Sequence, residues 1–345
     1  MAEAMCREME IRSFNLTNNK LNTIYFGGGT PSVLPVRLLE KLFHSIRSLF
    51  DTGDLEECTL EANPDDISDE KLKAWKVLGI NRLSIGLQTF DDQTLLWMNR
   101  IHNSDEGKAS VKRAQDAGFE NISLDLMYHF PETGLQHLEK DTEEISRLNP
   151  THISAYGLTL EPGTTFGQWE KKGKIKALPD DLAADEFQFL VQKLEEKGYP
   201  QYEISNFCRP GFEAKHNSAY WFQKPYLGIG PGAHGFDGEN HRYENLPSNA
   251  RYLGKLLKEN TLWQKEETLS AEDKINEAIL TRLRTKWGFH LKEWQQKTGL
   301  HLEIIKSSEI EKFETQGLLI RKQDTLFLSP SGKLLADRIA AELMV

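Results

Sequence analysis

Strand-like and helix-like segments alternate through the first half of this 345-residue chain. Runs rich in β-branched and aromatic residues recur at 23–26, 57–61, 82–88, 121–128 and 152–159. The first four runs are each followed by a segment with the apolar period of a helix. Strands that are separated by helices run parallel, with right-handed crossovers. The alternation therefore leaves two architectures, a doubly wound sheet or part of a (β/α) barrel.

Glycines and polar residues gather at the predicted carboxyl ends of these strands. They are residues 27–30, Glu61 with Asn63, Gln88, Asp125, and Tyr156 with Gly157. Parallel α/β folds place ligand sites at that edge. A single residue of this kind can instead be the cap of the next helix, and for Asn63 or Asp125 alone that explanation is preferred. Five strand ends with the same feature favour a partial barrel with a ligand site.

The first strand ends in three glycines, in the sequence Thr-Ile-Tyr-Phe-Gly-Gly-Gly-Thr-Pro-Ser over residues 23–32. Glycines let the main chain approach a bound group without a Cβ between them, and their N–H and C=O groups can hydrogen-bond an ammonium or a carboxylate. The segment lacks the Lys-Ser/Thr pair of a P-loop and the spacing of the dinucleotide fingerprint. We therefore expect it to present bare backbone to another kind of ligand.

Composition argues against several classes of function. The formal net charge of −10 repels nucleic acids and anionic membranes at long range. No apolar run approaches the roughly 20 residues of a transmembrane helix. Three cysteines (Cys6, Cys58 and Cys208) imply no disulfide framework, and no signal peptide is evident. We expect a cytoplasmic protein with no nucleic-acid partner and no transmembrane segment.

The pattern changes after residue 178. A long helix is predicted over 180–197 and an aromatic strand over 202–207. A segment rich in aromatic residues, 215–221, and a glycine loop, 228–235, follow. These features begin a second structural region with its own helices and strands.

The last part of the chain has the pattern of a winged-helix-like module, with helices, a hairpin over 318–320 and 325–328, and a final helix. From Glu303 onward, six Lys or Arg residues oppose seven Asp or Glu residues. A DNA-reading face is basic, so we expect a packing or partner module. The predicted domains are a partial barrel over 1–178, an α/β accessory region over 179–265 and the winged-helix-like module over 266–345.

Several motifs occur here in the order found in one protein family. They are the glycine segment, the turn 61–64, and the segments 85–90, 99–102 and 123–126 with Pro131. The chain resembles the radical S-adenosylmethionine proteins called oxygen-independent coproporphyrinogen III oxidase-like. Within that family, the segment 215–221 followed by 228–234 is similar to the haem chaperone branch rather than to the decarboxylating oxidase.

The resemblance implies a partial (β/α)6 barrel that binds S-adenosylmethionine. The residues that it assigns to this cofactor are Gly28, Gly29, Thr30, Glu61, Gln88, Arg100, Asp125 and Gly157. The first three would hold the methionine amino end, Arg100 its carboxylate and Gln88 the ribose, while the two carboxylates accept further hydrogen bonds. Gly157 would leave room beside adenine. Without the resemblance, Arg100 is better explained as a cation at a helix end.

One motif of the family is absent, the three cysteines spaced Cys-x3-Cys-x2-Cys. The three cysteines of this chain fall on separate predicted elements, whereas an iron–sulfur cluster needs thiolates that converge. Residues 1–26 have the pattern of the helix that follows the cysteine loop. We therefore expect that the first strand and the cluster loop are missing, through a misplaced start codon or a shortened chain. This chain alone should bind the cofactor weakly and form no radical.

Three functions are compatible with these residues. We expect a radical S-adenosylmethionine protein of porphyrin or haem metabolism, of the haem chaperone type, which in its complete form would use an electron donor such as flavodoxin or ferredoxin. The alternative is a non-catalytic haem carrier that needs no S-adenosylmethionine. A third possibility is an unrelated barrel enzyme with Glu61, Asp125 and His102 in acid/base roles. No nucleophile or metal-binding His pair supports that possibility.

In either haem-binding function the candidate haem contacts are His216, Asn217, Tyr220, Trp221 and His234. Haem iron accepts a histidine ligand, and aromatic faces pack on a porphyrin. A histidine among aromatic residues is more often a hydrogen-bonded structural residue. Both interpretations of His216 stay open at this point.

Overall fold

The computed structural model describes residues 1–13, 18–131, 133–175 and 178–345. Its contacts divide the chain into two compact units. We call residues 25–34 and 57–214 the barrel unit, and residues 1–24, 35–56 and 215–345 the flanking unit. This division does not test the three domains expected from sequence, which stay a prediction.

The barrel unit is built on a seven-stranded sheet with the order β1-β2-β3-β4-β5-β7-β6. The strands are β1 Thr23–Phe26, β2 Glu57–Ala62, β3 Arg82–Gln88, β4 Asn121–Tyr128, β5 His152–Gly157, β6 Gln201–Glu203 and β7 Asn206–Cys208. Strands β2 to β5 are parallel, and β7 pairs antiparallel with β5. The sheet curls into a half-barrel, which confirms the predicted partial barrel.

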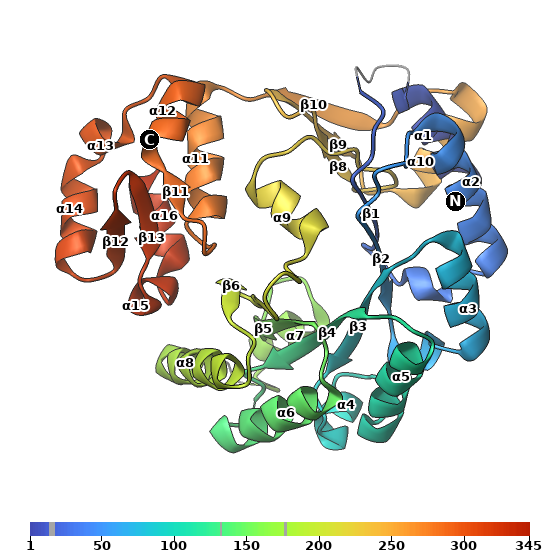
Figure 1. Cartoon of the computed structure of the whole chain (residues 1–345), viewed down its shortest axis with the longest axis horizontal. Coiled ribbons are helices and arrows are strands. Elements are labelled where there is room, and N and C mark those ends of the chain that lie inside the picture. Colours follow the sequence, from blue (N-terminus) through green and yellow to red (C-terminus); the bar gives the residue numbers. More distant parts are fainter. Residues whose placement is uncertain (14–17, 132, 176–177) are drawn as a thin grey trace. The chain divides into compact units, whose positions relative to one another are not determined.

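Helices follow the parallel strands as expected. They are η1 Pro31–Val33, η2 Pro64–Asp66, α3 Asp69–Leu78, α4 Asp92–Trp97, α5 Ser104–Asp116, α6 Leu135–Leu148, α7 Thr165–Lys171 and α8 Asp180–Glu196. A capping box of Asn103 and Glu106 starts α5, and Gly79 ends α3 with a φ of 92°. Figure 1 shows α5, α6 and α8 along the outer side of the strands.

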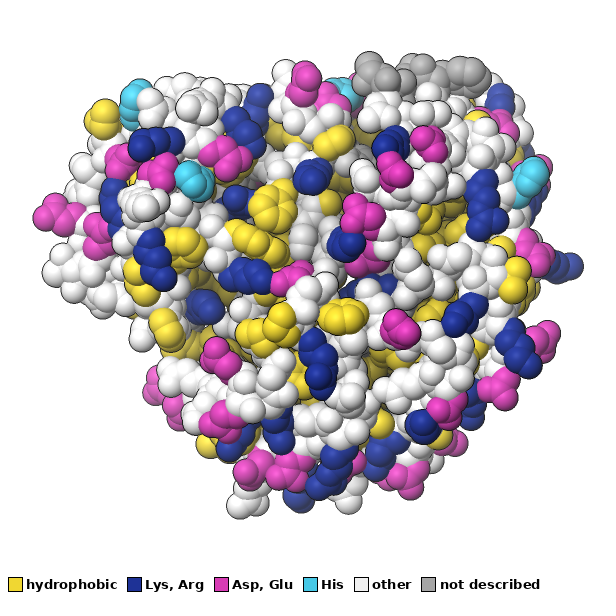
Figure 2. Space-filling view, viewed as in Figure 1, with side chains coloured by type: hydrophobic (Ala, Val, Ile, Leu, Met, Phe, Trp, Pro, Cys, Tyr) yellow, Lys and Arg dark blue, Asp and Glu magenta, His cyan; other side chains and the backbone are white. Residues whose placement is uncertain are grey.

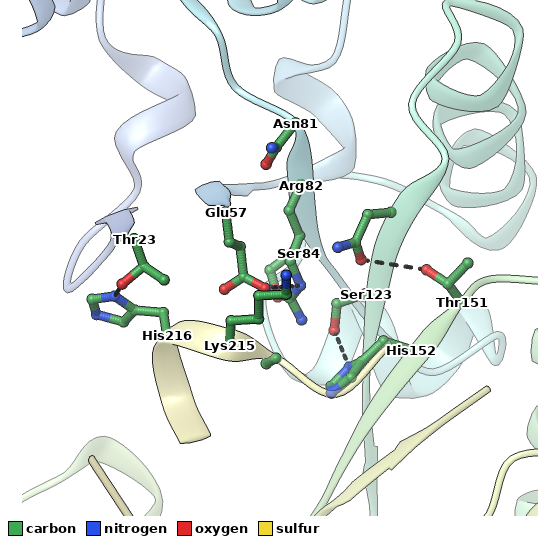
Figure 3. A network of polar contacts seen from close by, with 12 residues as sticks. Thr23, Glu57, Asn81, Arg82, Ser84, Ser123, Thr151, His152, Lys215 and His216 are labelled. Carbon is green, nitrogen blue, oxygen red and sulfur yellow. Dashed lines mark hydrogen bonds and ion pairs between the residues drawn. The ribbon is translucent and has the colours of Figure 1, made fainter. Parts of the chain in front are cut away.

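Side chains alternate between the two faces of the parallel strands. One face carries the buried apolar residues Cys58, Leu60, Leu83, Ile85, Ile122, Leu124, Ile153 and Ala155. The other carries the polar residues Glu57, Thr59, Arg82, Ser84, Ser123, Asp125, His152 and Ser154. Figure 3 shows part of this polar row, with Glu57 facing Arg82 and Ser123 bonded to His152. One face of the sheet is therefore lined with polar and charged side chains.

The flanking unit joins N-terminal helices to the second half of the chain. Its first elements are α1 Ala2–Ser13, α2 Val36–Leu49, α9 Lys215–Trp221, β8 His234–Phe236, β9 His241–Asn245, α10 Asn249–Gly254, η3 Lys255–Glu259 and β10 Gln264–Thr268. The three strands form an antiparallel sheet in the order β10-β9-β8.

The C-terminal part of this unit packs helices on a three-stranded antiparallel sheet, β11-β13-β12. Its elements are α11 Ala271–Arg282, β11 Phe289–His290, α12 Leu291–Thr298, α13 Leu302–Ile305, α14 Ser307–Thr315, β12 Leu319–Lys322, β13 Thr325–Leu328, α15 Pro330–Lys333 and α16 Ala336–Leu343. The predicted hairpin is confirmed. The segment before the hairpin forms two helices, α13 and α14, because the chain leaves helical geometry at Lys306, where φ is −119°.

A buried ion pair organises the flanking unit. Glu8 and Arg12 of α1 are 0% and 6% exposed, and their side chains meet at 2.7 Å. Glu8 also accepts hydrogen bonds from the Gly230 amide at 2.8 Å and from the Asn245 side chain at 2.6 Å. The Arg12 guanidinium lies 3.5 Å from the ring centre of Tyr243. One charge pair thus connects the first helix to the glycine loop and the β9 strand.

The molecular surface carries mixed charge. On the face drawn in Figure 2, basic and acidic side chains are interspersed, with no large area of one sign. Among the described residues, no helix combines the length and apolarity needed to cross a bilayer.

Candidate functional site

The glycine segment presents bare backbone at the end of β1. A Cβ built on Gly27 would lie 2.6 Å from Tyr25 Cε1 and 2.7 Å from Glu61 Oε1, so only glycine fits there without movement. Gly28 has a φ of 78°, which favours glycine. Gly28 and Gly29 are exposed, and no atom lies within 4 Å of a Cβ built on either. A ligand can therefore approach the backbone at these two positions.

The segment after the glycines is fixed to the neighbouring strand end by Ser32. Its hydroxyl donates to Asp66 Oδ2 at 2.7 Å and accepts from the Asn63 amide at 3.2 Å. Ser32 is fully buried, and its carbonyl also accepts a bond from Lys71 Nζ at 2.9 Å. These contacts hold the glycine segment beside the turn that follows Glu61.

Glu61 and Asp125 bring two carboxylates to this edge. Tyr25 donates its hydroxyl to Glu61 Oε1 at 2.8 Å, and burial, with the nearby Glu61 charge, raises the pKa of Tyr25. Ser84 donates to Asp125 Oδ1 at 3.1 Å. Burial raises the pKa of Asp125 to about 6, against the opposing effects of the Ser84 bond and the Arg82 charge. Asp125 is thus partly protonated just below neutral pH.

Arg100 contributes a cation near these carboxylates. Its Nη1 donates to Asn63 Oδ1 at 3.4 Å. Burial lowers the pKa of Arg100, while Asp65 and Asp125 oppose the shift, which places the guanidinium within the electrostatic reach of both acids. Arg100 also follows the end of α4, so its position agrees with the helix-end interpretation as well.

The ends of β3 and β4 hold two strained residues. Gln88 is buried with a φ of 72°, next to an irregularity in the β3–β4 pairing. His129, directly after β4, has a φ of 66°. Such conformations are uncommon for residues other than glycine and gather at functional sites. Gly157 at the end of β5 is exposed, and a Cβ there would make only ordinary contact with Tyr128, so its packing does not by itself require glycine.

The predicted haem residues lie in the flanking unit. His216 Nδ1 is 2.8 Å from Thr23 Oγ1, and its Nε2 is 2.9 Å from Tyr220 Oη. Figure 3 draws the contact between His216 and Thr23. The rings of Tyr220 and Tyr226 are 4.7 Å apart. No residue of α9 is fully buried, although the helix is rich in aromatic side chains. His216 therefore has hydrogen bonds on both ring nitrogens at the surface of an aromatic helix.

The other predicted haem residues are less closely grouped. Asn217 and Trp221 are half-buried on α9, with the Trp221 ring 6.3 Å from that of Trp287. His234 is exposed at the start of β8. The structure thus brings His216 and Tyr220 into direct contact.

His102 does not have the environment of an acid/base residue. It is 3% exposed, and its Nε2 lies 3.3 Å from the Leu87 carbonyl oxygen. Burial lowers its pKa. These contacts are those of a structural histidine, so the unrelated-barrel interpretation loses its proposed base.

Sequence reasoning missed two contacts at the carboxyl edge. Tyr25 bonds Glu61, and His129 lies 2.6 Å from Glu186 of α8. Each pair joins residues far apart in the chain, so no local spacing signals it. A pocket of about 1510 Å³ beside α4 and α6 was also missed. None of the eight predicted cofactor residues lines this pocket.

The cysteines do not fit an iron–sulfur cluster. Cys6 lies on α1, Cys58 on β2 and Cys208 on β7, and all three are buried thiols outside any disulfide bond. Three strands separate β2 from β7 in the sheet. Within the described part of the chain, no group of three His, Cys, Asp or Glu side chains is placed to hold a metal ion. We derive no step of chemistry through a cluster.

Comparison with known proteins identifies the family. The Radical SAM superfamily profile matches residues 8–145, and the HemN C-terminal domain profile matches residues 269–335. The heme chaperone HemW of Bacillus subtilis (strain 168) is 38% identical over 320 residues, which cover 92% of this chain and 84% of that protein. The chain belongs to the HemW family. HemW of Lactococcus lactis subsp. lactis (strain IL1403) is 36% identical over 336 residues, 97% of this chain and 87% of that protein.

A solved structure shows the same fold as this HemW-family chain. It is coproporphyrinogen III oxidase (HemN) from Escherichia coli, described as a radical SAM enzyme. The TM-score is 0.83 at 21% identity, over 99% of this chain and 82% of the other. The likeness supports the partial barrel and is consistent with the predicted C-terminal module.

Proposed function

We propose that this chain binds haem and delivers it to an acceptor, as a member of the radical S-adenosylmethionine proteins of haem metabolism. The observation that carries the proposal is the 38% identity to a protein named as a heme chaperone, over 92% of this chain. The aromatic surface of α9 supports it, because a porphyrin packs on aromatic faces. The acceptor is not identified.

The carboxyl edge of the barrel unit suits S-adenosylmethionine. Exposed glycine backbone can bond the methionine amino end, and Arg100 can bind a carboxylate through charge-assisted hydrogen bonds. Glu61 and Asp125 accept bonds from ammonium or hydroxyl groups. When bound, this cofactor supplies the adenosyl group of radical reactions. The contribution of this chain is to bind and orient it; the expectation that the chain alone forms no radical stays a prediction.

Binding of S-adenosylmethionine should strengthen as the pH rises through about 6. Asp125, with a pKa of about 6, becomes an acceptor-only anion above that value and attracts the cationic ligand. Below it, affinity should fall by up to about tenfold per pH unit, because one proton competes with the ligand. Calorimetric titrations between pH 5 and pH 8 measure the change.

Asp125→Asn is the matched variant for this measurement, because an amide keeps the shape of the side chain but does not ionise. We expect its affinity to be low and nearly constant over the same pH range. A wild-type affinity that does not change between pH 5 and pH 8 would remove Asp125 from the cofactor site. The raised pKa of Asp125 also stabilises the folded chain at low pH, a contribution that is lost as the pH rises through about 6.

Haem binding is tested by titrating hemin into the whole chain and following the Soret band. We expect saturable binding, and about three- to tenfold weaker binding by His216→Ala and Trp221→Ala, from the lost aromatic packing. His44→Ala, which removes an exposed histidine of α2, is the control for adventitious binding to surface imidazoles. Unchanged affinity in both α9 variants would exclude this helix from the haem site.

The alternative function is haem carriage without S-adenosylmethionine. The contact between His216 and Tyr220 supports it, because these haem candidates on α9 include none of the residues of the predicted cofactor site. The same titration with and without S-adenosylmethionine separates the two. Equal haem affinity in both conditions supports the cofactor-independent carrier, and a changed affinity supports linked sites.

Two further expectations concern the cellular compartment of the protein and its electron donor. Three buried cysteines outside any disulfide bond agree with a reducing cytoplasm. An electron donor such as flavodoxin or ferredoxin is part of the resemblance for a cluster-bearing protein, and it stays a prediction.

A further inference from the structure

Ser84 of β3 makes a hydrogen bond to one of the two carboxylates of the predicted cofactor site. Its hydroxyl donates to Asp125 Oδ1 at 3.1 Å and lies 3.4 Å from Oδ2. Both residues lie on the polar face of the sheet, because Ser84 pairs with Ser123 of β4 and Asp125 follows two positions later. Ser84 is not among the residues that the sequence assigns to the cofactor. The contact therefore adds a residue from an adjoining strand to the surroundings of this site.

The hydroxyl of Ser84 is dedicated to Asp125. Ser84 is 6% exposed, and within the described part of the chain its side chain hydrogen-bonds no other residue. Ser154, which pairs with Asp125 across β5, donates to Asn206 Oδ1 at 3.2 Å and has a smaller effect on the pKa of Asp125. A hydrogen bond donated to a carboxylate favours its charged form. Ser84 is thus the main hydroxyl that supports Asp125 as an anion.

The environment of Asp125 acts on its charge in both directions. Burial raises its pKa to about 6, and the bond from Ser84 and the charge of Arg82 oppose this shift. Titratable groups face Asp125 from each neighbouring element, and they are Tyr25 of β1, Glu61 of β2, Arg82 of β3, Arg100 after α4 and Tyr156 of β5. The two guanidinium groups favour the charged carboxylate, but neither hydrogen-bonds it in the described structure. Ser84 therefore makes the direct contact that opposes the effect of burial.

Ser84 is also the residue through which this effect can be tested cleanly. Arg82 is 2% exposed, and its Nε lies 4.0 Å from Oε2 of Glu57, which is equally buried. Removal of Arg82 would take a counter-ion away from a buried carboxylate and destabilise the fold. Loss of the Ser84 hydroxyl removes no charge, so it changes the support of Asp125 without breaking an ion pair.

We propose that Ser84 is a positioning residue for S-adenosylmethionine, because its hydrogen bond holds the Asp125 carboxylate as an oriented anion for the cationic ligand. This inference rests on the proposed binding of that cofactor at the carboxyl edge of the barrel unit. Ser84 acts through Asp125. Near pH 6 its bond decides whether the ligand meets an anion or a neutral acid, and only the anion attracts a cation.

The test compares the wild type with Ser84→Ala, which removes a single oxygen atom. Without the donor, the titration midpoint of Asp125 should rise by about one pH unit. The affinity for S-adenosylmethionine should then fall about fivefold at pH 6 and nearly equal that of the wild type at pH 8. Calorimetric titrations of the whole chain at both pH values measure the affinity. Recovery at pH 8 separates a change in the charge of Asp125 from structural damage, which would weaken binding at both pH values.

A second measurement follows Asp125 without any ligand. NMR spectra of aspartate-labelled protein record the side-chain carboxyl carbons between pH 5 and pH 8, and Asp125→Asn identifies the signal. We expect Ser84→Ala to raise its midpoint, and Ser84→Thr, which keeps the hydroxyl, to restore the wild-type value. Ser110→Ala is the matched control and should change nothing, because Ser110 is 1% exposed and its hydroxyl bonds only the Gly107 carbonyl of its own helix.

The outcomes separate this inference from the function on which it rests. An Asp125 midpoint that is the same in Ser84→Ala and in the wild type would overturn the role of Ser84 while leaving cofactor binding intact. An equal loss of affinity at pH 6 and pH 8 would overturn it as well. A raised midpoint with the wild-type profile of affinity against pH would remove Asp125 from the cofactor site. A wild type that binds no S-adenosylmethionine would overturn both the inference and the proposed cofactor site.

Discussion

Replacing Glu8 with glutamine should lower the free energy of unfolding of the flanking unit by about 3 kcal/mol. The substitution leaves Arg12 as a charged group that is 6% exposed and has lost its counter-ion. Breaking a buried ion pair by removal of one partner costs about 3–5 kcal/mol, because the remaining charge cannot be solvated. The neutral side-chain oxygen of glutamine would also accept a weaker hydrogen bond from the Gly230 amide than the carboxylate does.

Urea denaturation of the whole chain measures the global effect. Hydrogen exchange of the Gly230 amide measures the local effect, since that amide bonds Glu8 directly. The matched control is Glu10→Gln on the same helix, where Arg7 and Glu10 pair at 42% and 44% exposure. An exposed pair contributes about 0–1 kcal/mol. Equal losses in the two variants would show that burial of the Glu8 pair has no special energetic role.

A double variant, Glu8→Leu with Arg12→Met, separates the effect of the buried charges on stability from the effect of side-chain packing. Replacement of both members of a buried pair by apolar residues is often neutral or stabilising. We therefore expect the double variant to recover most of the stability that Glu8→Gln loses. Asn245 and Gln264 would still lose a partner each, which limits the recovery.

The parallel core of the fold was predictable because its signal is local. The strands predicted at 57–61, 82–88 and 121–128 are short runs bounded by helical patterns, and the structure has β2, β3 and β4 there. The convergence of Glu61, Gln88 and Asp125 at one edge also followed from the pattern, since parallel strands end on the same side. Because one strand–helix unit is repeated, this part of the fold could be predicted from the sequence.

Elements that depend on side-chain contacts were harder to predict from the sequence. The single strand predicted over 202–207 is a hairpin of β6 and β7, because Glu203 accepts hydrogen bonds from the Ser205 amide and from Asn206. Alternating aromatic residues gave no sign of this turn. In the same way, the side-chain contact of His129 is made with Glu186, 57 positions away. Such pairs become visible only when the fold has placed their helices and strands.

Gly27→Ala should disrupt the predicted cofactor site from within the glycine segment. The new methyl group would lie 2.6 Å from Tyr25 Cε1 and 2.7 Å from Glu61 Oε1, closer than real Cβ contacts allow. The chain must shift or the Tyr25–Glu61 hydrogen bond must break, at a cost of about 1–3 kcal/mol in stability. Affinity for S-adenosylmethionine should fall about tenfold or more, because hydrogen bonds to its charged amino end are lost.

Gly29→Ala is the control, two residues along the same segment. No atom lies within 4 Å of a Cβ built there, so its stability should equal that of the wild type. Thermal unfolding and calorimetric titration of both variants therefore separate two effects. A stable Gly29→Ala variant that binds S-adenosylmethionine poorly would show that the ligand itself approaches the backbone at residue 29. Wild-type stability in Gly27→Ala would instead show that Tyr25 and Glu61 can move aside, and that the hydrogen bond between them does not position the site.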